Sequence, residues 1–152
     1  HPIPRRQRQM CIRDSGTPQR SFNGLDGKRL NMLLAVLEKR GGLKLSQKDI
    51  FINVTGGIKI NDPAIDLAII CAVLSSNFDF PIPQKTCFIG EVGLSGEIRP
   101  VSRINERIKE VVKMGAEYIY VSKYAKLNKA ENGKYQIKKV VKVQEIIQQL
   151  IK

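Results

Sequence analysis

The fold is decided by a stretch that reads Asn61-Asp62-Pro63-Ala64-Ile65-Asp66-Leu67-Ala68-Ile69-Ile70-Cys71-Ala72-Val73-Leu74-Ser75-Ser76. Asp62 can accept a hydrogen bond from the unpaired amides of a first helical turn, and Pro63 suits the first helical position, where its missing N–H costs nothing. From Ile65 to Leu74 nearly every side chain is apolar, which predicts a helix buried on all sides. The run is too short and too polar at its ends to span a bilayer.

One carboxylate, Asp66, lies a turn into this predicted helix. A buried carboxylate is costly unless something pairs with it. One interpretation makes Asp62, Pro63 and Asp66 structural residues, with Asp66 held by first-turn amides or by a nearby basic side chain near the positive end of the helix dipole. The other makes the start of the helix a present or former active centre.

Charge is unevenly distributed along the 152 residues, whose net charge is +12. Residues 1–44 carry 10 Lys and Arg against 3 Asp and Glu, residues 45–97 carry 3 against 6, and residues 98–152 carry 13 against 5. Two basic segments therefore flank an acidic middle. This pattern favours an acidic partner, with nucleic acid first and an anionic membrane surface a weaker second.

Cysteine and histidine usage excludes several kinds of site. Cys11, Cys71 and Cys87 have no close spacing, which favours a reducing compartment over a disulfide framework or a zinc site. His1 is the only histidine, so histidine triads, histidine metal sites and histidine general bases are excluded. The basic N-terminal segment has no apolar core that would make it a signal peptide. We expect a cytoplasmic protein without a membrane partner.

Periodicity divides the chain into a tail, residues 1–17, and one domain, residues 18–152. The tail is expected to be disordered, and its resemblance to translated adapter sequence makes an artefactual origin the alternative. In the domain, helices are predicted over residues 26–40, 62–76, 102–114 and 143–151, the third capped by Ser102. Strands are predicted over residues 48–55, 58–60, 86–89, 118–121 and 138–143, with a glycine-framed hairpin over 90–100. Because the hairpin lacks a Gly-Lys-Ser/Thr ending, nucleotide binding is rejected. The order predicts a two-layer α/β or α+β fold.

Four segments resemble the C-terminal domain of the bacterial DNA repair protein family RadA, also called Sms. They read Met32-Leu33-Leu34-Ala35-Val36-Leu37-Glu38-Lys39-Arg40, Phe51-Ile52-Asn53-Val54-Thr55-Gly56-Gly57, Asp62-Pro63-Ala64-Ile65-Asp66-Leu67-Ala68 and Gly90-Glu91-Val92-Gly93-Leu94-Ser95-Gly96-Glu97-Ile98-Arg99. The resemblance runs from about Pro18 to Lys123. It implies a fold like the proteolytic domain of Lon and like domain 2 of ribosomal protein S5. The family's ATP, Mg²⁺ and Zn²⁺ belong to a RecA-like ATPase core and a zinc finger, so we expect no cofactor in this chain.

The Lon resemblance also implies where a catalytic dyad would stand. Lon-type peptidases use a serine after the proline at the start of the buried helix, activated by a lysine of lowered pKa from a following helix. In this chain Ala64 follows Pro63, and Asn105 occupies the lysine position. Neither a methyl group nor an amide can supply that chemistry, so the resemblance implies a pseudo-peptidase with no catalytic residue and no metal site.

The leading hypothesis is therefore a non-catalytic DNA-binding and oligomerisation domain of a DNA-repair ATPase. The family implies a hexameric ring that acts in recombination, branch migration and the processing of recombination intermediates, on single-stranded or branched DNA. The alternatives are an active Ser-Lys peptidase and a purely structural ring-forming module. The four Tyr and five Phe are scattered, so a base-stacking platform is not evident. Lys and Arg bind phosphates without sequence preference, and the candidates are Arg29, Lys39, Arg40, Lys59, Arg99, Arg103 and Arg107.

Overall fold

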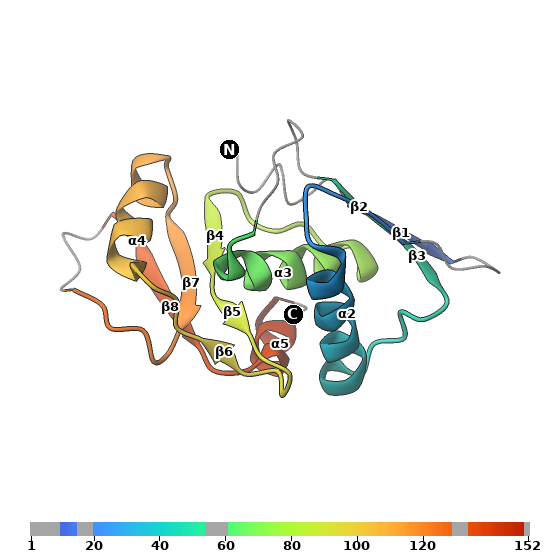
Figure 1. The fold of residues 1–152 in the computed structure, drawn as a ribbon. Helices are drawn as coiled ribbons and strands as arrows, with labels where there is room; N and C mark the ends of the chain where they lie inside the picture. Colours follow the sequence, from blue (N-terminus) through green and yellow to red (C-terminus); the bar gives the residue numbers. More distant parts are fainter. Residues whose placement is uncertain (1–9, 15–19, 54–60, 129–133, 151–152) are drawn as a thin grey trace.

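A computed structural model describes residues 10–14, 20–53, 61–128 and 134–150 of the chain (Figure 1). Its central element is helix α3, Asp66–Asn77, on which every residue from Asp66 to Leu74 is buried. This confirms the prediction of a helix buried on all sides. No helix in these described ranges is both long and apolar enough to cross a bilayer.

One sheet combines strands from the beginning of the chain in the order β1-β3-β2. Strand β1, Met10–Asp14, is antiparallel to β3, Lys48–Asn53, and strand β2, Arg20–Asn23, runs parallel to β3. The expectation that residues 1–17 form an unstructured tail therefore does not hold for Met10–Asp14. Its main chain pairs with a strand more than 30 residues away, a contact that composition does not reveal. The predicted strand 58–60 lies outside the described residues.

The second sheet is parallel throughout and has the order β4-β7-β8. Its strands are β4, Thr86–Ile89, β7, Tyr118–Ser122, and β8, Gln136–Val140. Strands β5, Glu91–Val92, and β6, Ile98–Arg99, form the predicted antiparallel hairpin. Together with the helices this makes a mixed α/β fold, as the sequence predicts at the level of fold class.

Helix α2, Gly27–Gly41, follows the signals in its sequence closely. The Asp26 side chain accepts a hydrogen bond from the Lys28 amide at the N-terminus. Gly42, with φ of 73°, ends the helix in the left-handed conformation that glycine adopts without strain. Local capping and one apolar stripe were sufficient to predict this element.

The beginning of α3 differs from the single helix predicted from Asp62. Pro63–Ile65 forms a separate 3-10 turn, η1, capped by Asp62, and the α-helix starts only at Asp66. The reason is tertiary. The Gly90 amide donates to the Ala64 carbonyl at 3.0 Å, and the Leu67 amide donates to the Gly90 carbonyl at 3.1 Å. These two hydrogen bonds to Gly90, which lies between β4 and β5, thus use main-chain groups that would pair within the helix in a regular first turn.

Helix α4, Ile104–Lys113, also begins differently from the prediction. Its N-cap is Arg103, in the left-handed conformation with φ of 57°, and no side chain caps it. The Ser102 cap was therefore wrong. The carbonyl of Ser102 instead accepts a hydrogen bond from Arg107 Nε at 2.8 Å. The last helix, α5, is Val143–Leu150.

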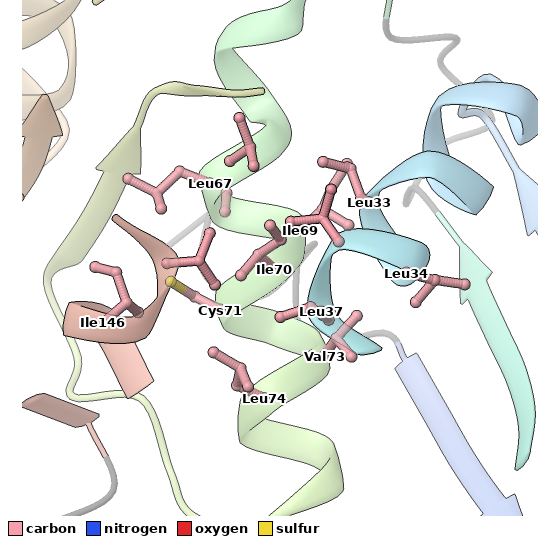
Figure 2. Close-up of a cluster of buried hydrophobic side chains, with 14 of the residues drawn as sticks. Leu33, Leu34, Leu37, Leu67, Ile69, Ile70, Cys71, Val73, Leu74 and Ile146 are labelled. Carbon is pink, nitrogen blue, oxygen red and sulfur yellow. The ribbon is translucent and has the colours of Figure 1, made fainter. Parts of the chain in front are cut away.

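Two hydrophobic clusters lie on opposite faces of the β4-β7-β8 sheet. In the larger one, side chains of α2, α3 and α5 meet, as Figure 2 shows for Leu37, Ile70 and Ile146. In the smaller one, α4 packs against the sheet through residues such as Ile108 and Ile119. Helix α3 therefore lies between the β1-β3-β2 side of the molecule and the sheet that carries α4 (Figure 1).

Candidate functional site

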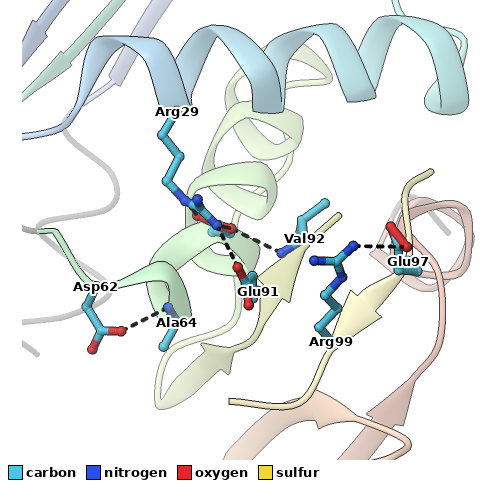
Figure 3. A network of polar contacts seen from close by, with 8 residues as sticks. Arg29, Asp62, Ala64, Glu91, Val92, Glu97 and Arg99 are labelled. Atoms are coloured by element: carbon cyan, nitrogen blue, oxygen red, sulfur yellow. Dashed lines mark hydrogen bonds and ion pairs between the residues drawn. The ribbon is translucent and has the colours of Figure 1, made fainter. Parts of the chain in front are cut away.

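A buried ion pair lies beneath the start of α3 (Figure 3). The Asp66 side chain is fully buried and accepts hydrogen bonds from Arg29 Nε at 2.7 Å, from Arg29 Nη2, and from the Val92 amide at 3.1 Å. Arg29 Nη2 also lies 3.3 Å from a carboxylate oxygen of Glu91. One guanidinium thus joins α2 to α3 and to strand β5.

The role of Arg29 follows from this geometry. The hydrogen bond to Asp66 raises the pKa of the Arg29 guanidinium, although partial burial opposes the change. The side chain is 30% exposed. Its ion-pair partners are the carboxylates of Asp66 and Glu91 in its own chain, so internal contacts neutralise the charge of this DNA-binding candidate.

A second ion pair fixes the entrance to η1. The Asp62 carboxylate accepts from the Ala64 amide at 3.0 Å with one oxygen and pairs with Arg107 through the other. Burial alone raises the pKa of Asp62, but the hydrogen bonds from Arg107 and Ala64 outweigh it and hold that pKa below its usual range. Arg107, another DNA-binding candidate, therefore ties α4 to η1.

Ala64 and Asn105, the two positions where the Lon resemblance would place a dyad, both make structural contacts. Ala64 is 6% exposed, and its methyl group belongs to the smaller hydrophobic cluster with Ile104 and Ile108. Asn105 donates from Nδ2 to the Lys126 carbonyl at 3.0 Å and accepts from the Asn128 amide at 2.8 Å. A lysine ammonium has only donors and could not make the second bond. Asn105 thus pins the loop that follows β7.

Two serine hydroxyls in the part of the chain that the structure describes donate to main-chain carbonyls. Ser75 Oγ donates to the Phe80 carbonyl, and Ser122 Oγ donates to the Ile98 carbonyl at 2.9 Å. Within the same ranges, no group of three or more His, Cys, Asp and Glu side chains is placed to hold a metal ion. The described site therefore consists of ion pairs and structural hydrogen bonds.

A hollow of about 240 Å³ opens between the beginnings of α2 and η1. Its lining is mixed, with apolar residues such as Leu30 and Ile69 beside the polar residues Arg29 and Asp62. Neither Ala64 nor Asn105 lines it. The two dyad positions therefore do not share this concave surface.

The remaining basic candidates are placed separately. Lys39 and Arg40 are exposed in the last turn of α2. Arg99 Nη2 lies 3.6 Å from Glu97 Oε2, and the Arg103 guanidinium pairs with the Glu106 carboxylate. Lys59 lies outside the described residues. Of the described candidates, four have carboxylate partners and two, Lys39 and Arg40, are exposed without an ion pair in the described ranges; the four are Arg29, Arg99, Arg103 and Arg107.

A group of exposed lysines that was not predicted from the sequence, here called the lysine edge, lies on β8 and the loops beside it. None of them has an ion pair within the described ranges, although a compositional signal existed in the 13 basic residues of segment 98–152. The Lys123 amide donates to the Val140 carbonyl, which brings the end of β7 beside the end of β8. The members of the lysine edge are Lys123, Lys126, Lys134, Lys138, Lys139 and Lys142.

Comparison with known proteins identifies relatives of the chain. A family model described as subunit ChlI of Mg-chelatase matches residues 27–124, which is 98 of the 152 residues. The chain belongs to this ChlI family. The match begins with α2 and ends just after β7, so it contains the Arg29–Asp66 pair, both dyad positions and the β5–β6 hairpin.

Curated relatives of this ChlI-family chain carry the name DNA repair protein RadA. That of Bacillus subtilis (strain 168) is 52% identical over 100 residues, covering 66% of this chain and 22% of the relative. That of Streptococcus pneumoniae (strain ATCC BAA-255 / R6) is 42% identical over 135 residues, covering 89% and 32%. That of Rickettsia typhi (strain ATCC VR-144 / Wilmington) is 45% identical over 111 residues, covering 73% and 25%. The chain thus spans between a fifth and a third of the length of these relatives.

Proposed function

We propose that this domain is a non-catalytic DNA-binding and self-assembly module of a RadA-type DNA-repair and recombination ATPase. Its similarity to relatives named DNA repair protein RadA supports a role in DNA repair. The proposal includes action on recombination intermediates, with single-stranded or branched DNA as ligand, a hexameric ring as the assembly, and the cytoplasm as the location. The module would need no cofactor of its own, because DNA binding and assembly require only surface contacts.

The finer proposal for the fold is a Lon-like, ribosomal-S5-domain-2-like domain that has lost its peptidase centre. The mixed α/β fold is compatible with it. The buried methyl of Ala64 and the two hydrogen bonds of the Asn105 amide support the loss of activity, because neither group can attack a carbonyl or take a proton from a hydroxyl at neutral pH.

The lysine edge is the observation that carries the DNA-binding part of the proposal. Its ammonium groups are exposed and are not neutralised by carboxylates within the described ranges, in contrast to Arg29, Arg103 and Arg107. Lysines that contact phosphates release condensed counterions, which gives binding without sequence preference and with a steep dependence on salt.

Salt-titrated DNA binding tests this proposal. For a duplex, removing two phosphate contacts should reduce the slope of log affinity against log salt by about 2. We expect that loss for Lys138→Glu with Lys139→Glu, measured by fluorescence anisotropy. Lys44 is an exposed residue of the loop between α2 and β3 and provides the control. Lys44→Glu makes the same kind of substitution at one position, with half the change in net charge, and should leave the slope close to that of the parent.

Two further measurements separate the alternatives. Light scattering at several concentrations tests ring formation, and assembly without DNA binding would leave a purely structural module. A peptidase assay on the unmodified chain and on Ala64→Ser with Asn105→Lys tests the peptidase alternative. Cleavage by the unmodified chain would contradict the pseudo-peptidase proposal.

A further inference from the structure

Two tyrosines of β7 share one face of the β4-β7-β8 sheet. Successive strand residues point to opposite faces, so Tyr118 and Tyr120 lie on one side while Ile119 and Val121 pack against α4 on the other. Tyr120 stacks on Phe88 of β4, with ring centroids 4.9 Å apart and an angle of 27° between the planes. Tyr118 is 37% exposed.

Polar side chains of β8 extend this row. In the parallel register Gln136 stands beside Tyr118, and Lys138 stands beside Tyr120. Both β8 residues are exposed. The four side chains of Tyr118, Tyr120, Gln136 and Lys138 are here called the tyrosine face. It lies on β7 and β8, whereas Phe88 of the neighbouring strand β4 is buried in the larger hydrophobic cluster.

Charge on and around the tyrosine face favours an anionic ligand. Lys138 has no ion pair within the described residues, and Lys134 is exposed shortly before β8 begins. The nearest carboxylate in sequence, Glu117, is already paired with Lys85 at 3.1 Å. An aromatic surface beside unneutralised cations is the combination that single-stranded nucleic acid requires, since bases stack on rings and phosphates bind ammonium groups.

We propose that the tyrosine face binds a single strand of nucleic acid by stacking an unpaired base on Tyr118. This inference rests on the proposed DNA-binding function and deepens it by choosing single-stranded DNA between the two proposed ligands and by naming the contact surface. Lys138 binds the adjoining phosphate, and the Gln136 amide donates to and accepts from a base edge. The phosphates of a duplex can bind the lysine edge, but the bases of a duplex are stacked inside it and cannot reach Tyr118.

The test compares oligothymidylate with a duplex of the same length, using the whole chain and labelled DNA. Loss of one base–aromatic contact should weaken oligothymidylate binding by roughly 5- to 100-fold and leave duplex binding unchanged. We expect this loss for Tyr118→Leu, which keeps apolar bulk in the strand, and little change for Tyr118→Phe, which keeps the ring. Tyr124→Leu is the matched control, because Tyr124 is 65% exposed but lies after β7.

The salt dependence separates stacking from charge. Tyr118→Leu should weaken single-strand binding with an unchanged salt slope, whereas Lys138→Gln should reduce that slope by about 0.7. Thermal unfolding checks that each variant is folded. The chain has no Trp and four Tyr, so quenching of tyrosine fluorescence by oligothymidylate, reduced in Tyr118→Leu, gives a second readout.

The outcomes that overturn the inference are distinct. Equal binding of Tyr118→Leu and the parent to oligothymidylate would refute the tyrosine face and leave the proposed DNA binding standing. Absence of binding to either DNA would refute both. Reduced self-association of Tyr118→Leu without a change in DNA affinity would make the face a contact between copies of the chain and refute its assignment to nucleic acid.

Discussion

Replacing Arg29 by Met should destabilise the domain strongly, because it removes the cation from a fully buried carboxylate. The Asp66 side chain would lose its bonds to Nε and Nη2 and keep only the one from the Val92 amide. Breaking a buried ion pair by removing one partner costs about 3–5 kcal/mol. The 30% exposure of Arg29 and the remaining amide bond reduce this to about 2–3 kcal/mol.

Thermal unfolding followed by circular dichroism measures the effect. For a chain of this size, that loss corresponds to a decrease in melting temperature of about 5–10 °C. Arg103→Met is the matched control, because Arg103 pairs with Glu106 in solvent, and it should leave the melting temperature unchanged. Denaturant unfolding of both variants gives the free energies directly.

A double variant tests the cause of the instability. Combining Arg29→Met with Asp66→Asn removes the unpaired charge, while the new amide oxygen can still accept from Val92. The double variant should recover most of the lost stability, which shows as a large interaction free energy in a double-mutant cycle. An Arg29→Met chain that melts within 2 °C of the parent, or a double variant less stable than the single one, would refute the reasoning.

Three further predictions concern other described contacts. The pKa of Asp62 is lower in the folded chain, so its stabilising contribution is complete above the unfolded pKa of about 3.9 and is lost as the pH falls through the folded value. The free energies of unfolding of Asp62→Asn and the parent should therefore differ by less than about 1 kcal/mol near neutral pH and become equal near pH 2. A difference that stays constant with pH would contradict this. Burial raises the pKa of Cys87 to about 11 and that of Cys71 well above its usual range. In a Cys11→Ser chain, an aromatic disulfide reagent should therefore label these two thiols only after unfolding. Fast labelling of the native chain would show that they are accessible. Asn105→Ala removes both bonds to the loop 126–128 and should speed amide hydrogen exchange at Asn128 while shifting global stability by about 1 kcal/mol; unchanged exchange there would show that the loop is held by other contacts.

Sequence signals predicted those elements whose determinants are local. Helix α2 has its cap, stripe and terminal glycine within one segment, and the hairpin of β5 and β6 is framed by glycines. The start of α3 depends on Gly90, which is distant in sequence, and β1 depends on pairing with β3. Periodicity contains no information about such partners, so the 3-10 turn and the first strand were not predicted.

The candidate site shows the same division. The absence of a hydroxyl at Ala64 and of an ammonium at Asn105 can be seen directly in the sequence. The sequence also indicated that Asp66 needed a partner, but it could not select Arg29, 37 positions away, among many cations. The tyrosine face was missed for a related reason. Alternation along β7 places Tyr118 and Tyr120 on one face, but only the register of β8 shows which polar side chains lie beside them.

The position of β8 at the end of its sheet has a consequence for how the chain behaves at high concentration. An open strand edge can act as a template for another strand, and lysine side chains along it discourage such pairing by mutual repulsion. Lys138 and Lys139 stand on this edge. Substitutions that remove their charge therefore reduce this repulsion and favour aggregation through edge-to-edge strand pairing. Affinity measurements on those variants need a parallel check for particles, since precipitation would mimic a loss of DNA binding.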